Sequence, residues 1–263
     1  MTNKGQQLHL AVREGNQGEI TKLLDSGVDI NSMYYGWTPL QLCLNQNNES
    51  LALLLIDRGC DVHLHDKNNV APFEEALIKG QTKVVRKMLN KGVDPNTPLS
   101  SGDPPLCVMC KRGMKDCVKE LVQVGKCSLN TVNQKGESPL YIASNEGYDG
   151  ILRILLEAGG DSDAIHKDTQ QTPLIAAANN DHADVVKILL KHGCDVNFTD
   201  VHNKTALWYA FSNSSLDVMK LLLKSGADKN VRNLDGQTIL DEAKDNDDDE
   251  VIELLTRFEK SWT

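Results

Sequence analysis

The sequence predicts an all-α fold built from repeated helix-turn-helix pairs that are joined by short β-hairpin or loop arms. Two markers recur in phase along the 263 residues. The middle residue of a Thr-Pro-Leu-like triplet stands at positions 39, 72, 105, 139, 173, 206 and 239. A glycine recurs at positions 27, 59, 92, 125, 159, 193 and 226. Because both markers keep a spacing of 32 to 34 residues, the chain is a repeat array whose units bury their apolar faces against their neighbours.

Residues 172–197 illustrate one unit. Thr172 is expected to cap a first helix, and Pro173 occupies the first turn, where its missing N–H costs nothing. Apolar residues between positions 185 and 190 recur at helical spacing and predict a second helix. Gly193 favours the end of that helix, and a polar arm completes the unit.

These units resemble ankyrin repeats. The resemblance is carried by strings such as Gly36-Trp37-Thr38-Pro39-Leu40 and covers about residues 5–258. It implies an ankyrin-repeat solenoid in which one domain, residues 1–263, contains eight repeats. The expected repeats are residues 3–31 as an N-terminal cap, 35–63, 68–96, 101–130, 135–163, 169–197, 202–230, and 235–258 as a C-terminal cap.

The fourth repeat departs from the pattern of the others. Pro104 stands where the other units usually carry a capping Thr or Ser, and Cys107 replaces the histidine that ties helix to hairpin in ankyrin repeats. A lost cap costs about 1 kcal/mol. We therefore expect this repeat to be the weakest of the array.

Composition narrows the class of protein. The chain is 40% hydrophobic with a net charge of −9, no apolar run approaches the ~18 residues of a membrane span, and the first residues lack an apolar core. We expect a cytoplasmic protein, with the nucleus as an alternative, whose seven cysteines stay reduced. The acidic balance argues against a general nucleic-acid binder.

The sequence lacks the common motifs of catalytic and cofactor-binding sites. We find no dinucleotide or phosphate-binding glycine loop, no zinc-protease motif and no nucleophile elbow, so the sequence predicts no enzyme and no cofactor. Cys107 and Cys110 form a C-x-x-C with Cys117 and Cys127 nearby, which leaves a zinc or redox site as an alternative. Buried packing is favoured, because Cys43 and Cys110 replace motif alanines.

The resemblance places partner contacts on hairpin tips and first helices. We expect the chain to be a monomeric adaptor or scaffold for a protein or peptide, without membrane or nucleic-acid binding. For Tyr35 and Trp37, packing on the neighbouring hairpin is an alternative, whereas Tyr141 and Trp208 are expected to be structural. The expected partner-binding residues are Tyr35, Trp37, Leu42, Gln46, Glu75, Lys79, Val108, Lys111, Arg112, Ile142, Asn145, Glu146, Asn180, Tyr209 and Asn213.

Charge patterning suggests the chemistry of that partner. Residues 66–131 hold eleven Lys/Arg against seven Asp/Glu, whereas residues 132–165 and 232–263 are acidic. A basic central surface suits an acidic or phosphorylated peptide. The second interpretation is a sensor of a phosphorylated small ligand such as an oligonucleotide. Gly36-Trp37-Thr38-Pro39-Leu40 and the following Pro72-Phe73 are similar to the ankyrin repeats of the oligoadenylate-activated antiviral ribonuclease, but Asp66 stands where a basic residue is expected.

Overall fold

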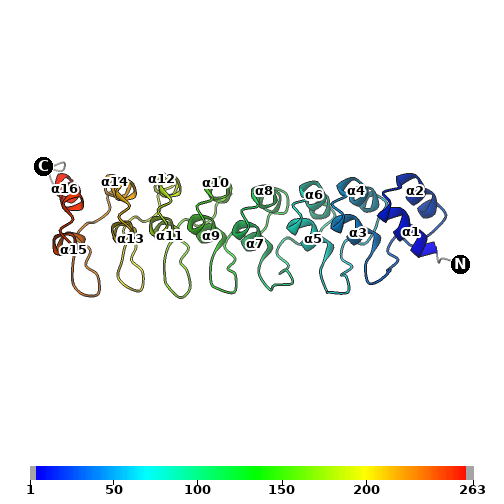
Figure 1. Cartoon of the computed structure of the whole chain (residues 1–263), viewed down its shortest axis with the longest axis horizontal. Coiled ribbons are helices and arrows are strands. Elements are labelled where there is room, and N and C mark those ends of the chain that lie inside the picture. The colour runs from blue at the N-terminus through cyan, green and yellow to red at the C-terminus, as the bar shows by residue number, and fades with distance from the viewer. Residues whose placement is uncertain (1–3, 259–263) are drawn as a thin grey trace. The chain divides into compact units, whose positions relative to one another are not determined.

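Sixteen helices, α1 to α16, account for the regular structure of residues 4–258 (Figure 1). The structure is a computed structural model and describes residues 4–258. Within that range no strand forms, and the one isolated β-bridge joins Tyr34 to Trp37. The predicted all-α repeat fold is confirmed. The helices belong to two compact units, which we call unit 1 (Met1–Ser128) and unit 2 (Leu129–Thr263).

Unit 1 contains four helix pairs in two layers. The first helices of the pairs pack in sequence, α1 on α3, α3 on α5 and α5 on α7, while α4 packs on α6 and α6 on α8. Hairpin arms extend from the layer of first helices (Figure 1). The helices are α1 Lys4–Arg13, α2 Gln17–Asp25, α3 Pro39–Asn45, α4 Glu49–Asp57, α5 Pro72–Ile78, α6 Thr82–Asn90, α7 Pro105–Lys111 and α8 Lys115–Gln123.

Unit 2 repeats the same arrangement. Helix α9 packs on α11 and α11 on α13, while α10 packs on α12 and α12 on α14. The core is made by apolar residues that both layers contribute, with Trp208 at 0% exposure among the largest. The helices are α9 Pro139–Asn145, α10 Asp149–Glu157, α11 Pro173–Asn179, α12 Ala183–Lys191, α13 Ala206–Ser212, α14 Leu216–Lys224, α15 Ile239–Asp245 and α16 Asp249–Arg257.

Most first helices begin at the hydroxyl cap that the sequence predicts. The Thr172 hydroxyl accepts a hydrogen bond from the Ile175 N–H at 3.3 Å, and Pro173 is the first helical residue. Gly193 follows α12 at φ +80°, as expected for its C-terminal cap. Helix α7 lacks a side-chain cap, as the sequence predicts, because the Pro104 side chain has no acceptor. That this repeat is the weakest of the array stays a prediction. The same hydroxyl bond caps the helices that follow Thr38, Ser138, Thr205 and Thr238.

A polar side chain on the first helix ties it to the hairpin that follows. His9 Nε2 donates to the Ser32 carbonyl at 2.7 Å, Gln41 Nε2 to the Leu64 carbonyl at 3.0 Å, and Trp208 Nε1 to the Val231 carbonyl at 3.1 Å. Each bond spans 23 residues. The structural role expected for Trp208 is confirmed by its burial and by this bond.

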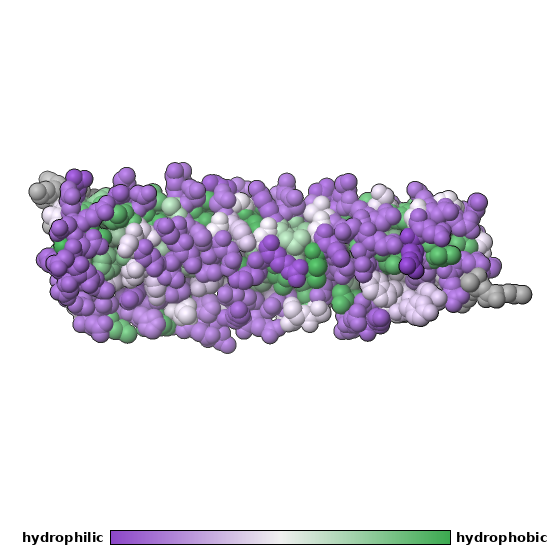
Figure 2. Space-filling view, in the orientation of Figure 1, coloured by the Kyte–Doolittle hydropathy of each residue, from purple (hydrophilic) through white to green (hydrophobic). Residues whose placement is uncertain are grey.

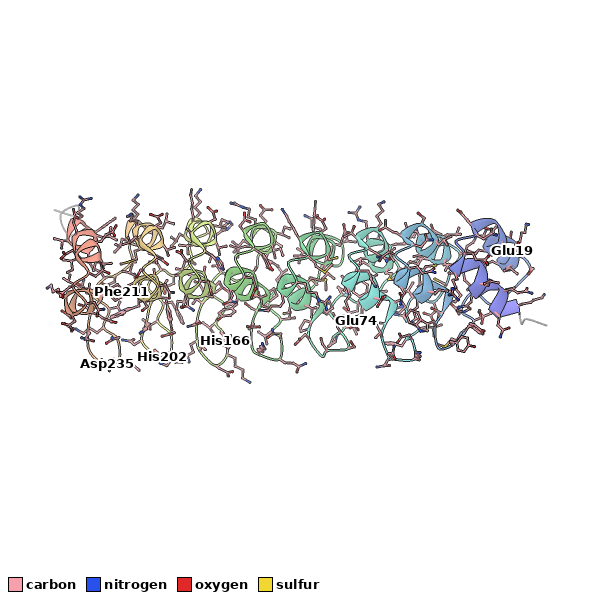
Figure 3. The ribbon with its side chains drawn as sticks, viewed as in Figure 1. Glu19, Glu74, His166, His202, Phe211 and Asp235 are labelled. Carbon is pink, nitrogen blue, oxygen red and sulfur yellow. The ribbon has the colours of Figure 1, made fainter. Side chains whose placement is uncertain are left out.

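Glu74 makes a related tie in the third repeat. Its carboxylate, 6% exposed, accepts hydrogen bonds from the Ser100 N–H at 2.8 Å and from the Ser100 hydroxyl at 2.5 Å. Glu74 lies on α5 and reaches toward the adjacent arm (Figure 3). A carboxylate at the motif histidine position thus also links the first helix to the arm that follows it.

All seven cysteines are buried. Burial raises the pKa of the Cys43, Cys60 and Cys194 thiols to about 12, and the pKa of Cys110 well above its ordinary value. In residues 4–258 no three His, Cys, Asp or Glu side chains are grouped so that they could hold a metal ion. The thiols thus pack as small apolar groups.

None of the helices in the described range combines the length and apolar character that crossing a bilayer requires.

We predict that Ala71→Thr stabilises the chain. Ala71 precedes α5 at φ −76°, ψ 147°, close to the φ −84°, ψ 161° of the capping Thr38, but provides no acceptor. A threonine hydroxyl there can accept from the Glu74 N–H and should raise the free energy of unfolding by about 1 kcal/mol in urea titration. Ala71→Val is the control, since valine has the same shape without the hydroxyl. Equal unfolding midpoints for the two variants would contradict this capping argument.

We also predict that stability falls at alkaline pH. A thiol whose folded-state pKa is raised stabilises the fold below its unfolded pKa near 9, and this contribution is lost as pH rises toward about 12. For Cys43, which is 0% exposed, the loss at pH 10 is about 1 kcal/mol. Cys43→Ala restores the motif alanine and should show a flatter decline in urea midpoint above pH 9 in reducing buffer. A decline as steep as that of the unmodified chain would show that this thiol contributes nothing to it.

Candidate partner-binding surface

The first hairpin is closed by a tight turn that presents an aromatic side chain. Tyr34 and Trp37 exchange both main-chain hydrogen bonds, at 3.0 and 3.2 Å, with Tyr35 at φ +52° and Gly36 at φ +80° between them. Positive φ at both central residues is typical of a type I′ turn. A Cβ on Gly36 would lie 2.5 Å from the Lys67 Cβ, so only glycine fits there. The turn leaves Tyr35 80% exposed.

A groove of about 530 Å³ lies between α1, this hairpin and α3. We call it the aromatic groove. Four of its residues lie three or four positions apart on α1 and so share one face of that helix. In the part of Figure 2 that unit 1 occupies, pale and green side chains interrupt the purple surface. The groove is lined by Gln6, His9, Leu10, Arg13, Tyr34, Tyr35, Trp37, Leu42 and Asn45.

Ring contacts hold the aromatic wall in place. Tyr34 packs edge-on against Tyr35, with ring centroids 4.4 Å apart, and lies 5.7 Å from the His9 ring. His9 is 5% exposed, and this burial lowers the pKa of its imidazole. The hydrogen bond between the two tyrosines raises the pKa of Tyr34. Both shifts favour the uncharged forms of His9 and Tyr34 at neutral pH.

The groove brings together three of the predicted contact residues, Tyr35, Trp37 and Leu42. Gln46 lies beside it, since its Nε2 donates to the Arg13 carbonyl at 3.2 Å. Trp37 is half-buried and is paired with Tyr34 through the main chain. Its side chain lines the groove, and its contact with a partner stays a prediction.

Sequence reasoning missed the α1 side of the groove. Leu10 and Arg13 stand 32 residues before Leu42 and Asn45, in the same register of the repeat. Extending that register one unit toward the N-terminus would have identified them. The first repeat, however, lacks the Thr-Pro pair that marks the register elsewhere.

The remaining predicted residues of unit 1 lie on α5 and α7 or cap their C-terminal ends. Lys79 pairs with Glu75 at 3.7 Å, so part of the expected basic surface is neutralised. Val108 is half-buried, and Lys111 and Arg112 are exposed.

The second helices of unit 1 neutralise further basic residues by pairing between repeats. Arg86 donates from Nε and Nη2 to the Glu120 carboxylate at 2.8 and 2.6 Å. Lys83 pairs with Glu49 at 3.5 Å, and Lys87 pairs with Asp57. The positive charge of residues 66–131 is therefore only partly available to a partner.

Ile142 requires a correction. The sequence predicts that it lies at the surface, but its side chain is only 2% exposed. Helix α9 is buried at every residue from Pro139 to Ser144, so the position that is half exposed at Leu42 in unit 1 is covered here. The Ile142 side chain cannot contact a partner in this conformation.

Polar residues at the helix ends of unit 2 bond to one another. Asn180 Nδ2 donates to Asn145 Oδ1 at 3.1 Å, and Asn145 Nδ2 donates to Glu146 Oε1 at 3.1 Å. Asn213 Nδ2 donates to the Asn179 carbonyl at 2.7 Å. These predicted contact residues therefore link neighbouring first helices, and a partner would meet amides that already have hydrogen bonds.

Tyr209 belongs to a second hydrogen-bond network. Its hydroxyl donates to Asp200 Oδ2 at 2.6 Å and accepts from Gln171 Nε2 at 3.0 Å. Burial, reinforced by Asp200, raises the pKa of Tyr209 to about 12. Asp200 also accepts from the N–H groups of His202 and Lys204, and His202 lies in the arm labelled in Figure 3. The position of the Tyr209 side chain is therefore set by hydrogen bonds to Asp200 and Gln171 within the protein.

Asp66 has the same role in its own arm as Asp200. Its Oδ1 accepts from the N–H groups of Asn68 at 2.8 Å and Val70 at 2.9 Å. The carboxylate thus organises a turn at the position where the oligonucleotide interpretation expects a basic residue.

Comparisons with known proteins agree with this architecture. The family model described as ankyrin repeats (3 copies) matches residues 3–66, 73–166 and 158–233. A putative ankyrin repeat protein of Rickettsia felis is 25% identical over 115 residues, 44% of this chain and 40% of the relative. The ankyrin repeat, SAM and basic leucine zipper domain-containing protein 1 of Nomascus leucogenys is 33% identical over 101 residues, 35% of this chain and 21% of the relative. The chain thus matches less than half the length of these curated relatives.

A solved structure extends the likeness across most of the chain. The ankyrin repeat domain of Bcl-3, described as a unique member of the IkappaB protein family, matches with a TM-score of 0.66 and 25% identity. The match covers 89% of this chain and 92% of the other. The repeat period, the paired helices with their arms and these matches together show that the chain belongs to the ankyrin repeat family.

Proposed function

We propose that the chain is a non-catalytic adaptor or scaffold that binds a peptide or a folded partner, with the aromatic groove of unit 1 as the principal contact. Ankyrin repeats are in general protein–protein interaction modules, which supports the class of function. The observation that carries the choice of surface is the groove itself. Leu10 and Tyr35, 54% and 80% exposed, stand on its two walls. Exposed aromatic and aliphatic side chains beside a cavity are typical anchors of binding energy.

The other predicted contact residues extend the proposed binding surface beyond the groove, and most of them are polar. Glu75, Lys79, Val108, Lys111 and Arg112 would extend the contact along unit 1, and the cations would favour an acidic or phosphorylated partner. In unit 2, Asn145, Glu146, Asn180, Tyr209 and Asn213 would add a polar contact of lower affinity, because each is already engaged internally. We propose a monomer that acts in the cytoplasm or the nucleus.

We predict that Leu10→Ala and Tyr35→Asn each weaken partner binding about tenfold. Asparagine is chosen at position 35 because it tolerates the positive φ of that residue. Binders are first selected from a random displayed peptide library on the unmodified chain, and their affinities for each variant are then measured by calorimetry. Both side chains are exposed, so the free energy of unfolding should change by less than about 0.5 kcal/mol for Leu10→Ala.

Leu234→Ala is the matched control for these variants. Leu234 is an exposed leucine of unit 2, 71% accessible and distant in sequence from the groove. Its loss should leave affinity unchanged. The proposal fails if the selected peptides bind Leu10→Ala and Tyr35→Asn as tightly as the unmodified chain. Titration with a short phosphorylated oligonucleotide is run alongside, and tight binding of that probe would favour the ligand-sensor interpretation instead.

A further inference from the structure

The aromatic groove carries a single charge. Of its nine lining residues none is acidic, and Arg13 is the one basic residue. His9 also lines the groove, but burial lowers the pKa of its imidazole and keeps it neutral. The groove is therefore a largely apolar surface with one fixed positive charge in its lining.

The Arg13 side chain is available to bind an anion. It is the last residue of α1, and its carbonyl accepts a hydrogen bond from Gln46 Nε2, which ties this helix end to α3. The residue is exposed, and its guanidinium forms no ion pair with any residue between 4 and 258. In contrast, Arg58 and Arg86 of the same unit each pair with a carboxylate. A guanidinium presents several N–H donors in a planar arrangement that fits a carboxylate or phosphate.

The size and polarity of the groove limit its occupant. A volume of about 530 Å³ lies in the range of small-ligand pockets, ~300–1,000 Å³, and accommodates a few side chains rather than a folded domain. Leu10 and Leu42 supply aliphatic walls, while Tyr34, Tyr35 and Trp37 supply aromatic ones. A large apolar side chain would bury most of its surface between them.

We propose that the groove takes a peptide segment in which a large apolar side chain is directly adjacent to an anionic group, and that Arg13 binds this anion. This inference rests on the function proposed above and adds the chemistry of the partner. The positive charge of Arg13 favours a peptide segment that carries a negative charge. A cation could stack on the aromatic rings, but it would meet Arg13 and find no carboxylate in the lining. The anion could be an Asp or Glu side chain or a phosphorylated residue.

The test uses four acetylated and amidated peptides with the full chain. They share the sequence Gly-Ser-Trp-X-Ser-Gly, where X is Asp, phosphoserine, Asn or Lys. Dissociation constants are measured by fluorescence anisotropy for the unmodified chain, Arg13→Gln, Arg13→Lys and Arg153→Gln. Arg153 is an exposed arginine on α10 of unit 2, so its variant removes the same charge elsewhere.

We expect the Asp and phosphoserine peptides to bind about threefold or more tightly than the Asn peptide, and the Lys peptide to bind most weakly. This preference should disappear in Arg13→Gln, persist partly in Arg13→Lys and persist fully in Arg153→Gln. The ratio of the Asp to the phosphoserine affinity then identifies the source of the anion.

Three results would overturn the inference. They are equal affinities for Asp and Asn, tightest binding of the Lys peptide, and an unchanged preference in Arg13→Gln. Failure of all four peptides to bind would also reject it. The proposed function is judged separately, because library-selected peptides that depend on Leu10 and Tyr35 but ignore Arg13 would support the groove and reject this partner chemistry.

Discussion

The hydrogen bond from His9 to the Ser32 carbonyl determines where the first hairpin lies, and the aromatic groove depends on it. The bond is 2.7 Å long, and the ring that makes it is 5% exposed, so little water competes for it. The same ring lies 5.7 Å from Tyr34. One buried side chain on α1 thus fixes both the main chain of the hairpin and the first ring of its aromatic wall. The Tyr35-Gly36 turn then places the second tyrosine outward.

Several repeats link their first helix to the following arm by a hydrogen bond, although the side chain that makes it differs from repeat to repeat. Gln41 and Trp208 reach a carbonyl 23 residues ahead, as His9 does, while Glu74 accepts from the following arm instead. An amide, an indole and a carboxylate each satisfy main-chain groups that would otherwise lose hydrogen bonds on burial. The stacking of apolar helix faces therefore builds the repeats, and these polar ties orient the arms that present the candidate surface.

Local signals made most of the fold predictable, whereas the site depended on contacts between repeats. The cap at Thr172, the helix that follows it and the turn at Gly193 each follow from a few adjacent residues. Leu10 and Arg13 were missed because the first repeat lacks the markers that set the register. Ile142 was misplaced because equivalent positions differ in burial when neighbouring helices pack differently. A count of charged residues overestimates the positive charge of the predicted surface, because Lys79 pairs with Glu75.

Hydrogen–deuterium exchange of the full chain, with and without a library-selected peptide, tests most directly whether the aromatic groove is the binding surface. The account predicts that bound peptide slows exchange in residues 6–13 and 33–45, which form α1, the first hairpin and α3. Residues of the second helices, such as those of α10 and α12, should exchange at the same rate in both states. Protection confined to unit 2 or to second helices, with residues 6–13 unchanged, would contradict the account.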